Sequence, residues 1–291
     1  MQSADSLIRY TFANAPVRGE LVQLQESYQR LVEGHNYPKV IQHLLGELMA
    51  VTSLLSATLK FDGQINLQLQ GNVKLNFATV NGSQQQQLRG VARLTDELSD
   101  KLGDASFAEL FGDKGYLIIT LSPDDGERYQ GMVEVKPTDT SLATVIERYF
   151  TQSEQLQTRV WLFASDTQVG GLLLQSMPGE DDPEHGFEHL ATLTHTMTAD
   201  ELFSLDAEVV LQRLYHEEEV IVYEPAPVQF YCGCSRERSM HALYSVSIDE
   251  LRDILQTDGE IRLTCDYCLT DYVYDENDVG AIQGHQNDNL Q

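Results

Sequence analysis

The stretch INLQLQGNVKLNFATVNGSQQQQLRGVARL, residues 65–94, decides the fold of the larger part of this chain. Apolar and polar residues alternate in three runs within it, which is the pattern of β-strands that bury one face. The pairs Gly71-Asn72 and Asn81-Gly82 are typical of tight turns, and the glutamines at 84–87 are expected at a loop tip. Strands joined by turns this short predict an antiparallel sheet.

The same alternation continues on both sides of this stretch. Strand-like runs are found at residues 7–13, 17–25, 116–122, 128–135, 158–165 and 169–177. Residues 37–60 instead carry apolar side chains every three or four positions, and residues 141–156 are also helical in pattern. Blocks of strands with helices between the blocks favour an α+β fold with a largely antiparallel sheet over a series of βαβ units.

All four cysteines lie in two close pairs near the end of the sequence, Cys232-Gly233-Cys234 and Cys265-Asp266-Tyr267-Cys268. Four thiolates in two chelating pairs can complete a tetrahedron around Zn²⁺, with Zn–S distances of about 2.3 Å. Residues 235–261 between the pairs predict two short helices and a turn, which is too little for a large core. The sequence therefore predicts one zinc ion on these four cysteines, and this ion would supply much of the folding free energy of a small domain.

Spacing alone leaves three roles open for the cysteines. They could form a purely architectural zinc knot, or a redox switch, since each pair is close enough in sequence for a disulfide and Gly233 would relax a Cys232–Cys234 ring. A thioredoxin-like catalyst is the third role. Against it, the second pair lies outside any βαβ context, and Asp266 beside Cys265 disfavours the thiolate that such a catalyst needs.

The charge of the chain is strongly negative and unevenly distributed. The chain has 19 Lys and Arg against 45 Asp and Glu, a net charge of −26, which excludes a general nucleic-acid coat. Residues 1–178 carry 14 basic and 20 acidic side chains (net −6), residues 179–231 carry one and 13 (net −12), and residues 232–291 carry four and 12 (net −8). The middle segment is a strip of like charge with one internal basic partner.

These shifts in composition predict three parts. Residues 1–178 form an N-terminal α+β domain, residues 179–231 an acidic helical linker of low intrinsic stability, and residues 232–291 a small zinc-binding domain. In the linker, helical spacing places Phe187, Leu190, Leu193 and Met197 on one face. Short acidic helices need a surface to lie on, so we expect this apolar face to cover a sheet of the first domain.

Several other classes of protein are disfavoured by the sequence. It contains no run of about 20 apolar residues that could span a membrane, and MQSADSLIRY lacks the pattern of a secretory signal, so we expect a cytoplasmic protein with no membrane partner. The two commonest phosphate-binding loops are missing, so ATP-driven work is not indicated. The residues from His185 to His189 fit an H-x-x-E-H pattern, but they begin a marginal acidic helix, and we interpret them as a solvated helix start.

Several motifs together resemble the redox-regulated 33-kDa heat-shock chaperone (chaperonin) family of bacteria. They are the cysteine pattern, SRER at 235–238, RLYHEEEVIVYEP at 213–225, VRGELV at 17–22, TSLLSATLKFDGQINLQLQG at 52–71, RGVAR at 89–93 and GERYQGMV at 126–133. The resemblance extends over essentially the whole chain. It implies an ATP-independent holdase, not an enzyme, that is inactive while reduced and zinc-bound.

The resemblance also implies how such a protein is activated. Oxidants would join Cys232 to Cys234 and Cys265 to Cys268 and expel the zinc, after which the zinc domain and the linker unfold. The exposed apolar surface would capture unfolding client proteins, and the oxidised form would be a homodimer. The rival interpretations are a structural zinc module for partner binding and a thiol oxidoreductase. The absence of lysine from residues 232–291 disfavours nucleic acid as the partner.

Overall fold

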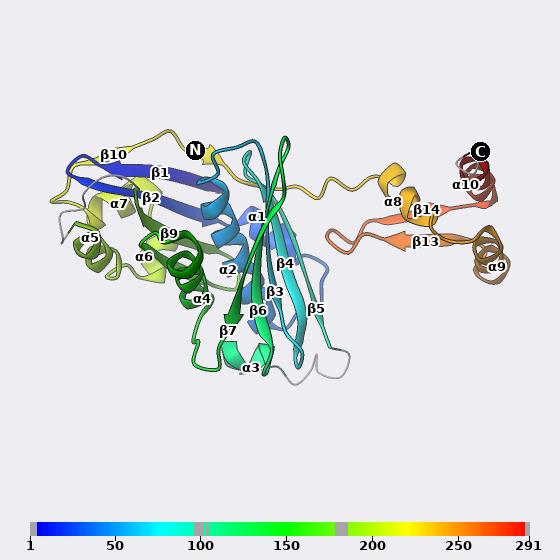
Figure 1. Cartoon of the computed structure of the whole chain (residues 1–291), viewed down its shortest axis with the longest axis horizontal. Helices are drawn as coiled ribbons and strands as arrows, with labels where there is room; N and C mark the ends of the chain where they lie inside the picture. The colour runs from blue at the N-terminus through cyan, green and yellow to red at the C-terminus, as the bar shows by residue number, and fades with distance from the viewer. Residues whose placement is uncertain (1–4, 96–101, 103–104, 178–185, 289–291) are drawn as a thin grey trace. The chain divides into compact units, whose positions relative to one another are not determined.

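A computed structural model of the chain describes residues 5–95, 102, 105–177 and 186–288. The chain folds as two compact units, Met1–Tyr231 and Cys232–Gln291 (Figure 1). The predicted boundary at residues 178–179 lies outside the described residues, as does His185 of the H-x-x-E-H pattern, and the division into three parts stays a prediction. Among the described residues, no helix is long and apolar enough to cross a membrane.

The first unit contains two sheets whose strands are almost entirely antiparallel. One sheet has the order β12 (Gln229–Phe230), β5 (Gln87–Leu94), β4 (Leu75–Ser83), β3 (Gly63–Gln70), β6 (Gly115–Pro123) and β7 (Tyr129–Val135). The other has the order β10 (Val220–Val222), β1 (Ser6–Phe12), β2 (Ala15–Leu24), β9 (Val169–Ser176) and β8 (Thr158–Ala164), and β11 (Ala226–Pro227) also pairs with β1. Among the strands that the structure describes, only β12 and β5 run parallel. The predicted α+β class with largely antiparallel sheets is confirmed.

The central helix α2 (Lys39–Ser56) packs against strands of both sheets and forms the main core with them. Its apolar period is the one that the sequence indicated, and from Leu44 onward only Glu47 escapes full burial. Shorter helices surround this core: α1 (Glu26–Val32), α3 (Phe107–Phe111) and α4 (Leu142–Tyr149), which continues as a π-helical turn over Phe150–Glu154.

The expected turn at Asn81-Gly82 is wrong, because β4 runs on through both residues to Ser83 and the chain turns at residues 84–86. A Cβ atom on Gly82 would come within 2.8 Å of Thr52 and 2.7 Å of Ser56 on α2. Gly82 is therefore needed for the close approach of α2 to the sheet, and not for a turn conformation. The glutamine run does form the turn, but Gln86 is buried there and accepts a hydrogen bond from the Ser53 hydroxyl at 2.6 Å.

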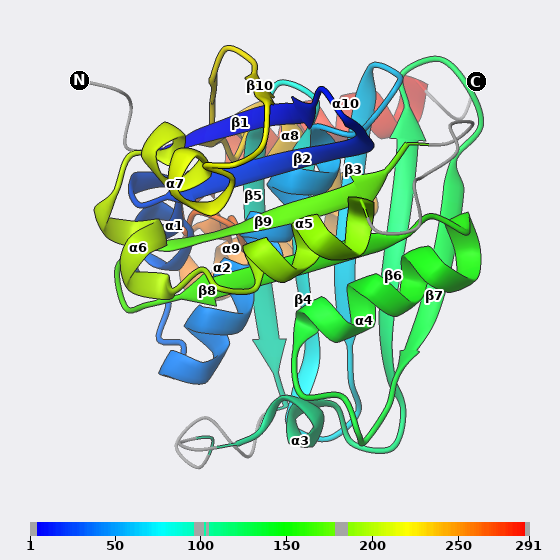
Figure 2. The ribbon, with the colours of Figure 1, turned by 90° about the vertical axis from the view of Figure 1, so that its left-hand side faces the viewer.

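Three short helices cover the face of the sheet formed by β1, β2, β9 and β8 that points away from α2 (Figure 2). They are α5 (Gly186–Thr194), α6 (Ala199–Ser204) and α7 (Ala207–Leu214). Phe187 and Leu190 are 1% exposed and Met197 is 6% exposed, while Leu193 is partly buried in the same cluster. Their apolar partners come from β1, β2 and β9 and include Ile8, Tyr10, Phe12, Val17, Leu21, Leu172 and Leu174. We call this second core the cover cluster, and residues 186–230 the cover segment.

Polar contacts also hold the cover segment in place. The Tyr215 hydroxyl lies 2.6 Å from Thr194 Oγ1 and 3.3 Å from the Tyr10 hydroxyl, and all three side chains are buried. Thr194 donates to the carbonyl of Leu190, so the hydroxyl of Tyr215 donates to Thr194 and that of Tyr10 donates to Tyr215. This chain of hydrogen bonds links β1 to both α5 and the end of α7.

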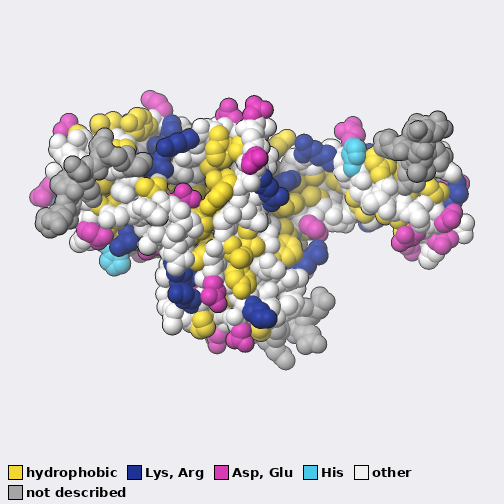
Figure 3. Space-filling model, in the orientation of Figure 1, with side chains coloured by type: hydrophobic (Ala, Val, Ile, Leu, Met, Phe, Trp, Pro, Cys, Tyr) yellow, Lys and Arg dark blue, Asp and Glu magenta, His cyan; other side chains and the backbone are white. Residues whose placement is uncertain are grey.

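The charges of the cover segment are only sparsely compensated. Its single arginine, Arg213, lies 3.5 Å from Glu201, and Arg159 of β8 lies 3.4 Å from Glu188. Figure 3 shows acidic side chains at the end of the first unit that these helices form, and around the second unit. Exposed ion pairs of this kind contribute about 1 kcal/mol or less each, so they add little to the apolar face of the helices and to the pairing of β10, β11 and β12 in holding the segment.

The second unit is small. It consists of α8 (Arg236–Leu243), α9 (Ile248–Asp258), the hairpin of β13 (Ile261–Thr264) and β14 (Asp271–Tyr274), and α10 (Glu276–Asp288). The two helices were predicted, whereas the hairpin and α10 were not. Its buried apolar residues are Leu243, Leu251, Ile261, Tyr274, Val279 and Ile282. A core of this size gives little stability by itself.

Candidate metal centre

The first cysteine pair lies in the turn that precedes α8. Gly233 has a φ of 64°, a left-handed conformation that glycine adopts without strain, and it lets Cys232 and Cys234 point to the same side. Two hydrogen bonds with Arg238 hold the turn against the start of α8. The Arg238 side chain donates to the carbonyl of Gly233 at 2.6 Å, and the Ser235 hydroxyl caps α8 by accepting from the Arg238 amide. The sequence therefore builds a chelating turn directly onto the start of a helix.

The second pair lies in the turn of the β13–β14 hairpin. The amide of Cys265 donates to the carbonyl of Thr270 at 2.9 Å, and the amide of Leu269 donates to the carbonyl of Cys265 at 2.8 Å. Leu269 has a φ of 57°, which reverses the chain after Cys268. These bonds hold both thiols of the pair at one end of the hairpin.

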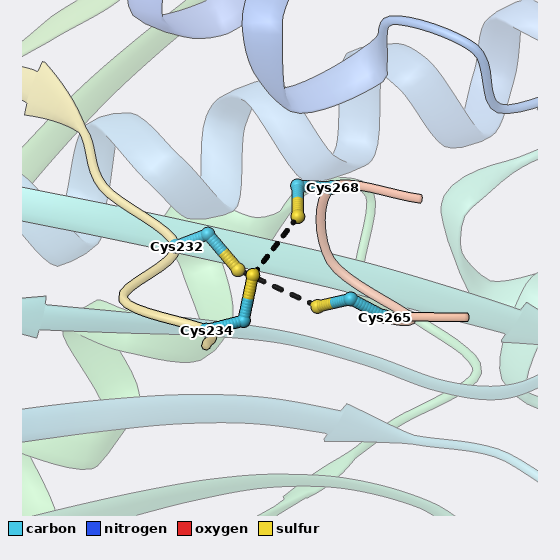
Figure 4. A group of neighbouring side chains, drawn as sticks. All are labelled: Cys232, Cys234, Cys265 and Cys268. Atoms are coloured by element: carbon cyan, nitrogen blue, oxygen red, sulfur yellow. Dashed lines mark hydrogen bonds between the residues drawn. The ribbon is translucent and has the colours of Figure 1, made fainter. Parts of the chain in front are cut away.

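The four sulfur atoms converge on one point (Figure 4). Cys232 Sγ lies 3.5 Å from Cys265 Sγ, Cys234 Sγ lies 3.4 Å from Cys268 Sγ, and all four atoms are within 4.8 Å of one another. A tetrahedral site with metal–sulfur bonds of about 2.3 Å requires sulfur atoms about 3.8 Å apart. The structure thus brings together all four predicted ligands, with no disulfide among them, in an arrangement that could hold a metal ion.

The thiols of the cluster differ in pKa. Burial raises the pKa values of Cys232 and Cys234. At Cys268 burial also acts to raise the pKa, but the hydrogen bonds with Thr270, Cys234 and Cys232 together outweigh it and lower the pKa to about 7. A bound cation favours the thiolate form of every sulfur that it contacts. Four thiolates this close would repel one another, so the anionic form of the cluster fits a bound cation.

Sequence reasoning missed the side chains that support the sulfurs. The Tyr272 hydroxyl donates to Cys234 Sγ at 3.1 Å, and this bond raises the pKa of Tyr272 well above its ordinary value. The Thr270 hydroxyl lies 3.3 Å from Cys268 Sγ. Tyr272 lies in β14, and Thr270 directly precedes that strand. The alternation of residues in Asp271–Tyr274 could have predicted the strand and the face that Tyr272 shares with Tyr274.

The two arginines of the SRER motif serve the second unit internally. Arg236 donates to Asp278 at 2.7 Å and to the carbonyl of Val273 at 3.1 Å, and its guanidinium lies 4.5 Å from the centre of the Tyr274 ring. Arg238 holds the carbonyl of Gly233, as described above. The charges therefore link the first cysteine turn and α8 to β14 and α10.

Of the H-x-x-E-H pattern, the structure describes only the later residues. His189 Nε2 lies 3.0 Å from Glu218, and Glu188 pairs with Arg159. Within the described part of the chain, the one group of His, Cys, Asp and Glu side chains that could hold a metal is the four cysteines. The pattern is interpreted, as before, as part of a solvated helix.

Comparison with known proteins gives one consistent result. A family profile described as Hsp33 protein matches residues 5–275. Proteins named 33 kDa chaperonin from Shewanella sp. strain ANA-3 and Shewanella putrefaciens strain CN-32 are each 54% identical to this chain; the matches cover 96% and 98% of this chain and 95% and 98% of those proteins. The crystal structure of the 33 kDa chaperonin from Thermotoga maritima matches with a TM-score of 0.82 and 21% identity, covering 97% of this chain and 99% of that chain, which shows the same fold.

Proposed function

Since this chain belongs to the Hsp33 protein family, we propose that it is a redox-regulated, ATP-independent holdase that protects unfolding proteins from aggregation under oxidative stress. It is a chaperone and not an enzyme, as its sequence motifs indicated, and its partners are client proteins. We place it in the cytoplasm, where a reducing environment keeps its thiols ready for oxidation.

The proposed resting state holds one Zn²⁺ on Cys232, Cys234, Cys265 and Cys268. Sulfur donors in two chelating turns suit zinc, and the Cys₄ set leaves no open position for catalysis. The second unit has only a small apolar core of its own. Bound zinc would therefore contribute a large part of its stability, so loss of the metal becomes loss of the fold.

Activation begins with oxidation of both thiol pairs. In each pair two thiolates give two electrons to hypochlorous acid, which takes up a proton and leaves as chloride and water, while a sulfur–sulfur bond forms. We propose disulfides between Cys232 and Cys234 and between Cys265 and Cys268, which consume all four ligands and release Zn²⁺. Gly233, already left-handed, permits the small ring that the first disulfide closes.

The observation that carries the proposal is the apolar face beneath the cover segment. Helices α5 to α7 hide the apolar side chains of β1, β2 and β9, and the segment that contains them joins directly to Cys232. The cover segment, residues 186–230, carries nine acidic side chains and one arginine, so its like charges repel one another. We propose that unfolding of the second unit, which follows the segment at Cys232, leads to release of the segment. The release would expose a surface able to bind unfolded chains, with the charge keeping the open form in solution. We propose a homodimer for this form.

One experiment separates this function from its rivals. The zinc-loaded protein is treated with hypochlorous acid, and zinc release and suppression of client aggregation are measured in the same samples, with and without later reduction. We expect both to rise together and to reverse on reduction. Zinc loss without suppression of aggregation would support a structural zinc module, and turnover of small disulfides would support an oxidoreductase. A variant with all four cysteines replaced by serine is the control that cannot respond to oxidant.

A further inference from the structure

Tyr272 joins the two halves of the thiol cluster. Its hydroxyl donates to Cys234 Sγ at 3.1 Å, although the two residues are 38 positions apart. Tyr272 belongs to β14, which follows directly after the turn that holds Cys265 and Cys268. The bond therefore links the first cysteine turn to the strand that leaves the second.

The position of Tyr272 is fixed by the strand around it. Leu263 of β13 is its antiparallel partner, and both side chains pack against the small apolar core of the second unit. Tyr274, two residues on and on the same face, donates to the carbonyl of Arg236 at 2.8 Å. One face of β14 thus contacts Cys234 of the first cysteine turn through its sulfur atom and the start of α8 through the backbone oxygen of Arg236.

A hydroxyl donor changes what a thiolate can do. A phenol has a pKa of about 10 and is a donor at neutral pH, and its hydrogen bond to an anionic sulfur is charge-assisted. The bond stabilises the anion and makes its electrons less available to an oxidant, since the rate of attack follows the nucleophilicity of the thiolate. Its loss would leave Cys234 both less restrained and more reactive.

We propose that Tyr272 is a positioning residue of the metal centre: its hydroxyl holds Cys234 in the ligand arrangement and slows oxidation of that sulfur, and so raises the oxidant dose at which the centre opens. The effect on the oxidant dose rests on the proposed function, whereas the test below measures the metal centre alone. Tyr272→Phe removes the hydroxyl and keeps the ring in the core. Tyr274→Phe is the matched control, because it removes a hydroxyl from the same face of the same strand without touching sulfur.

The test uses the full chain loaded with Zn²⁺ or, as a spectroscopic probe, with Co²⁺. In Tyr272→Phe we expect release of Zn²⁺ by peroxide to be about tenfold faster than in the parent, the size that loss of one hydrogen bond to a charged group produces. We also expect the sulfur-to-cobalt charge-transfer band to move to lower energy, because a thiolate without its donor gives up an electron more easily. Tyr274→Phe should leave the band in place.

Two outcomes overturn the inference. One is an unchanged cobalt band and release rate in Tyr272→Phe, and the other is an equal change in both variants, which would show that only the stability of the strand matters. Faster release with a shifted band supports it even if the released protein does not suppress client aggregation. In that case the proposed function fails and the role of Tyr272 stands.

Discussion

Val209 and Val210 are neighbours on α7 that differ in one respect, and they allow a direct test of the cover segment as a lid. Val210 is 2% exposed and belongs to the cover cluster, whereas Val209 is 36% exposed. Replacing either by alanine removes the same two methyl groups from the same helix. We predict that only Val210→Ala loosens the cover segment from the sheet beneath it.

The size of the effect follows from burial. Two buried methyl groups are worth about 1.6 kcal/mol, and incomplete closure of the cavity brings the cost of Val210→Ala to about 2 kcal/mol. At 1.4 kcal/mol per factor of ten, local opening of the segment becomes about 30-fold more frequent. Val209→Ala should change stability by a few tenths of a kcal/mol, in the stabilising direction, since alanine is the better helix former.

Hydrogen exchange of the reduced, zinc-loaded protein measures this opening directly. Amides of α5 to α7 should exchange about 30-fold faster in Val210→Ala, while those of α2 keep their protection. The same variant should suppress client aggregation at a lower dose of oxidant than the parent. Equal exchange in the two variants would refute the claim that the apolar face holds the segment. Faster exchange without a change in the oxidant dose would refute its role as the lid.

Three further predictions concern charge and metal. Removing the metal by a chelator under reducing conditions should unfold the second unit and leave the sheets of the first intact, as seen by hydrogen exchange; unchanged protection of α8 and α9 would contradict this. Glu217 and Glu219 are exposed, and replacing both by Gln should weaken the repulsion within the cover segment and make its release harder. The double variant should then need more oxidant than the parent before it suppresses client aggregation, and an unchanged dose would show that self-repulsion has no part in release. Burial raises the pKa of Glu20 from 4.5 to about 7, against the attraction of Arg18 and Arg9, so the folded chain keeps a proton that the unfolded chain releases. The stability that protonated Glu20 contributes is therefore fully present below pH 4.5 and is lost as the pH rises to about 7. Urea unfolding at pH 7.5 should show Glu20→Gln to be more stable than the parent by up to about 3 kcal/mol. If the free energies of unfolding of the two proteins changed in parallel with pH, the assignment would be wrong.

Much of the fold could be predicted because its signals are local. Strand alternation and the period of α2 depend on which face of an element is buried, and a sequence records that directly. The turn at Gly82 was mispredicted because an Asn-Gly pair carries the same letters whether glycine serves a turn or the approach of a helix, and only the contact with Thr52 and Ser56 distinguishes the two. The hairpin that carries Cys265 and Cys268 was missed because its strands are only four residues long.

The candidate site shows the same division. The four cysteines were identified from spacing alone, since chelation requires close pairs. Tyr272 could not be, because its bond to Cys234 spans 38 residues and depends on how β14 meets the first turn. The apolar face of the cover segment was likewise visible as a helical period, while the strands that it covers were not. Which sulfurs join on oxidation stays a prediction, because short sulfur contacts in the reduced cluster also run between the pairs, from Cys232 to Cys265 and from Cys234 to Cys268.

The cover segment also supplies an edge strand to each sheet of the first unit. Its strands β10 and β11 pair with β1, and its strand β12 pairs with β5, so each sheet has one rim formed by this segment. If the segment leaves, β1 and β5 become open edges whose amide and carbonyl groups lack partners, and such edges accept any extended chain without regard to its side chains. An opened molecule would then offer main-chain hydrogen bonds beside its apolar face, a form of recognition suited to partners that share no sequence.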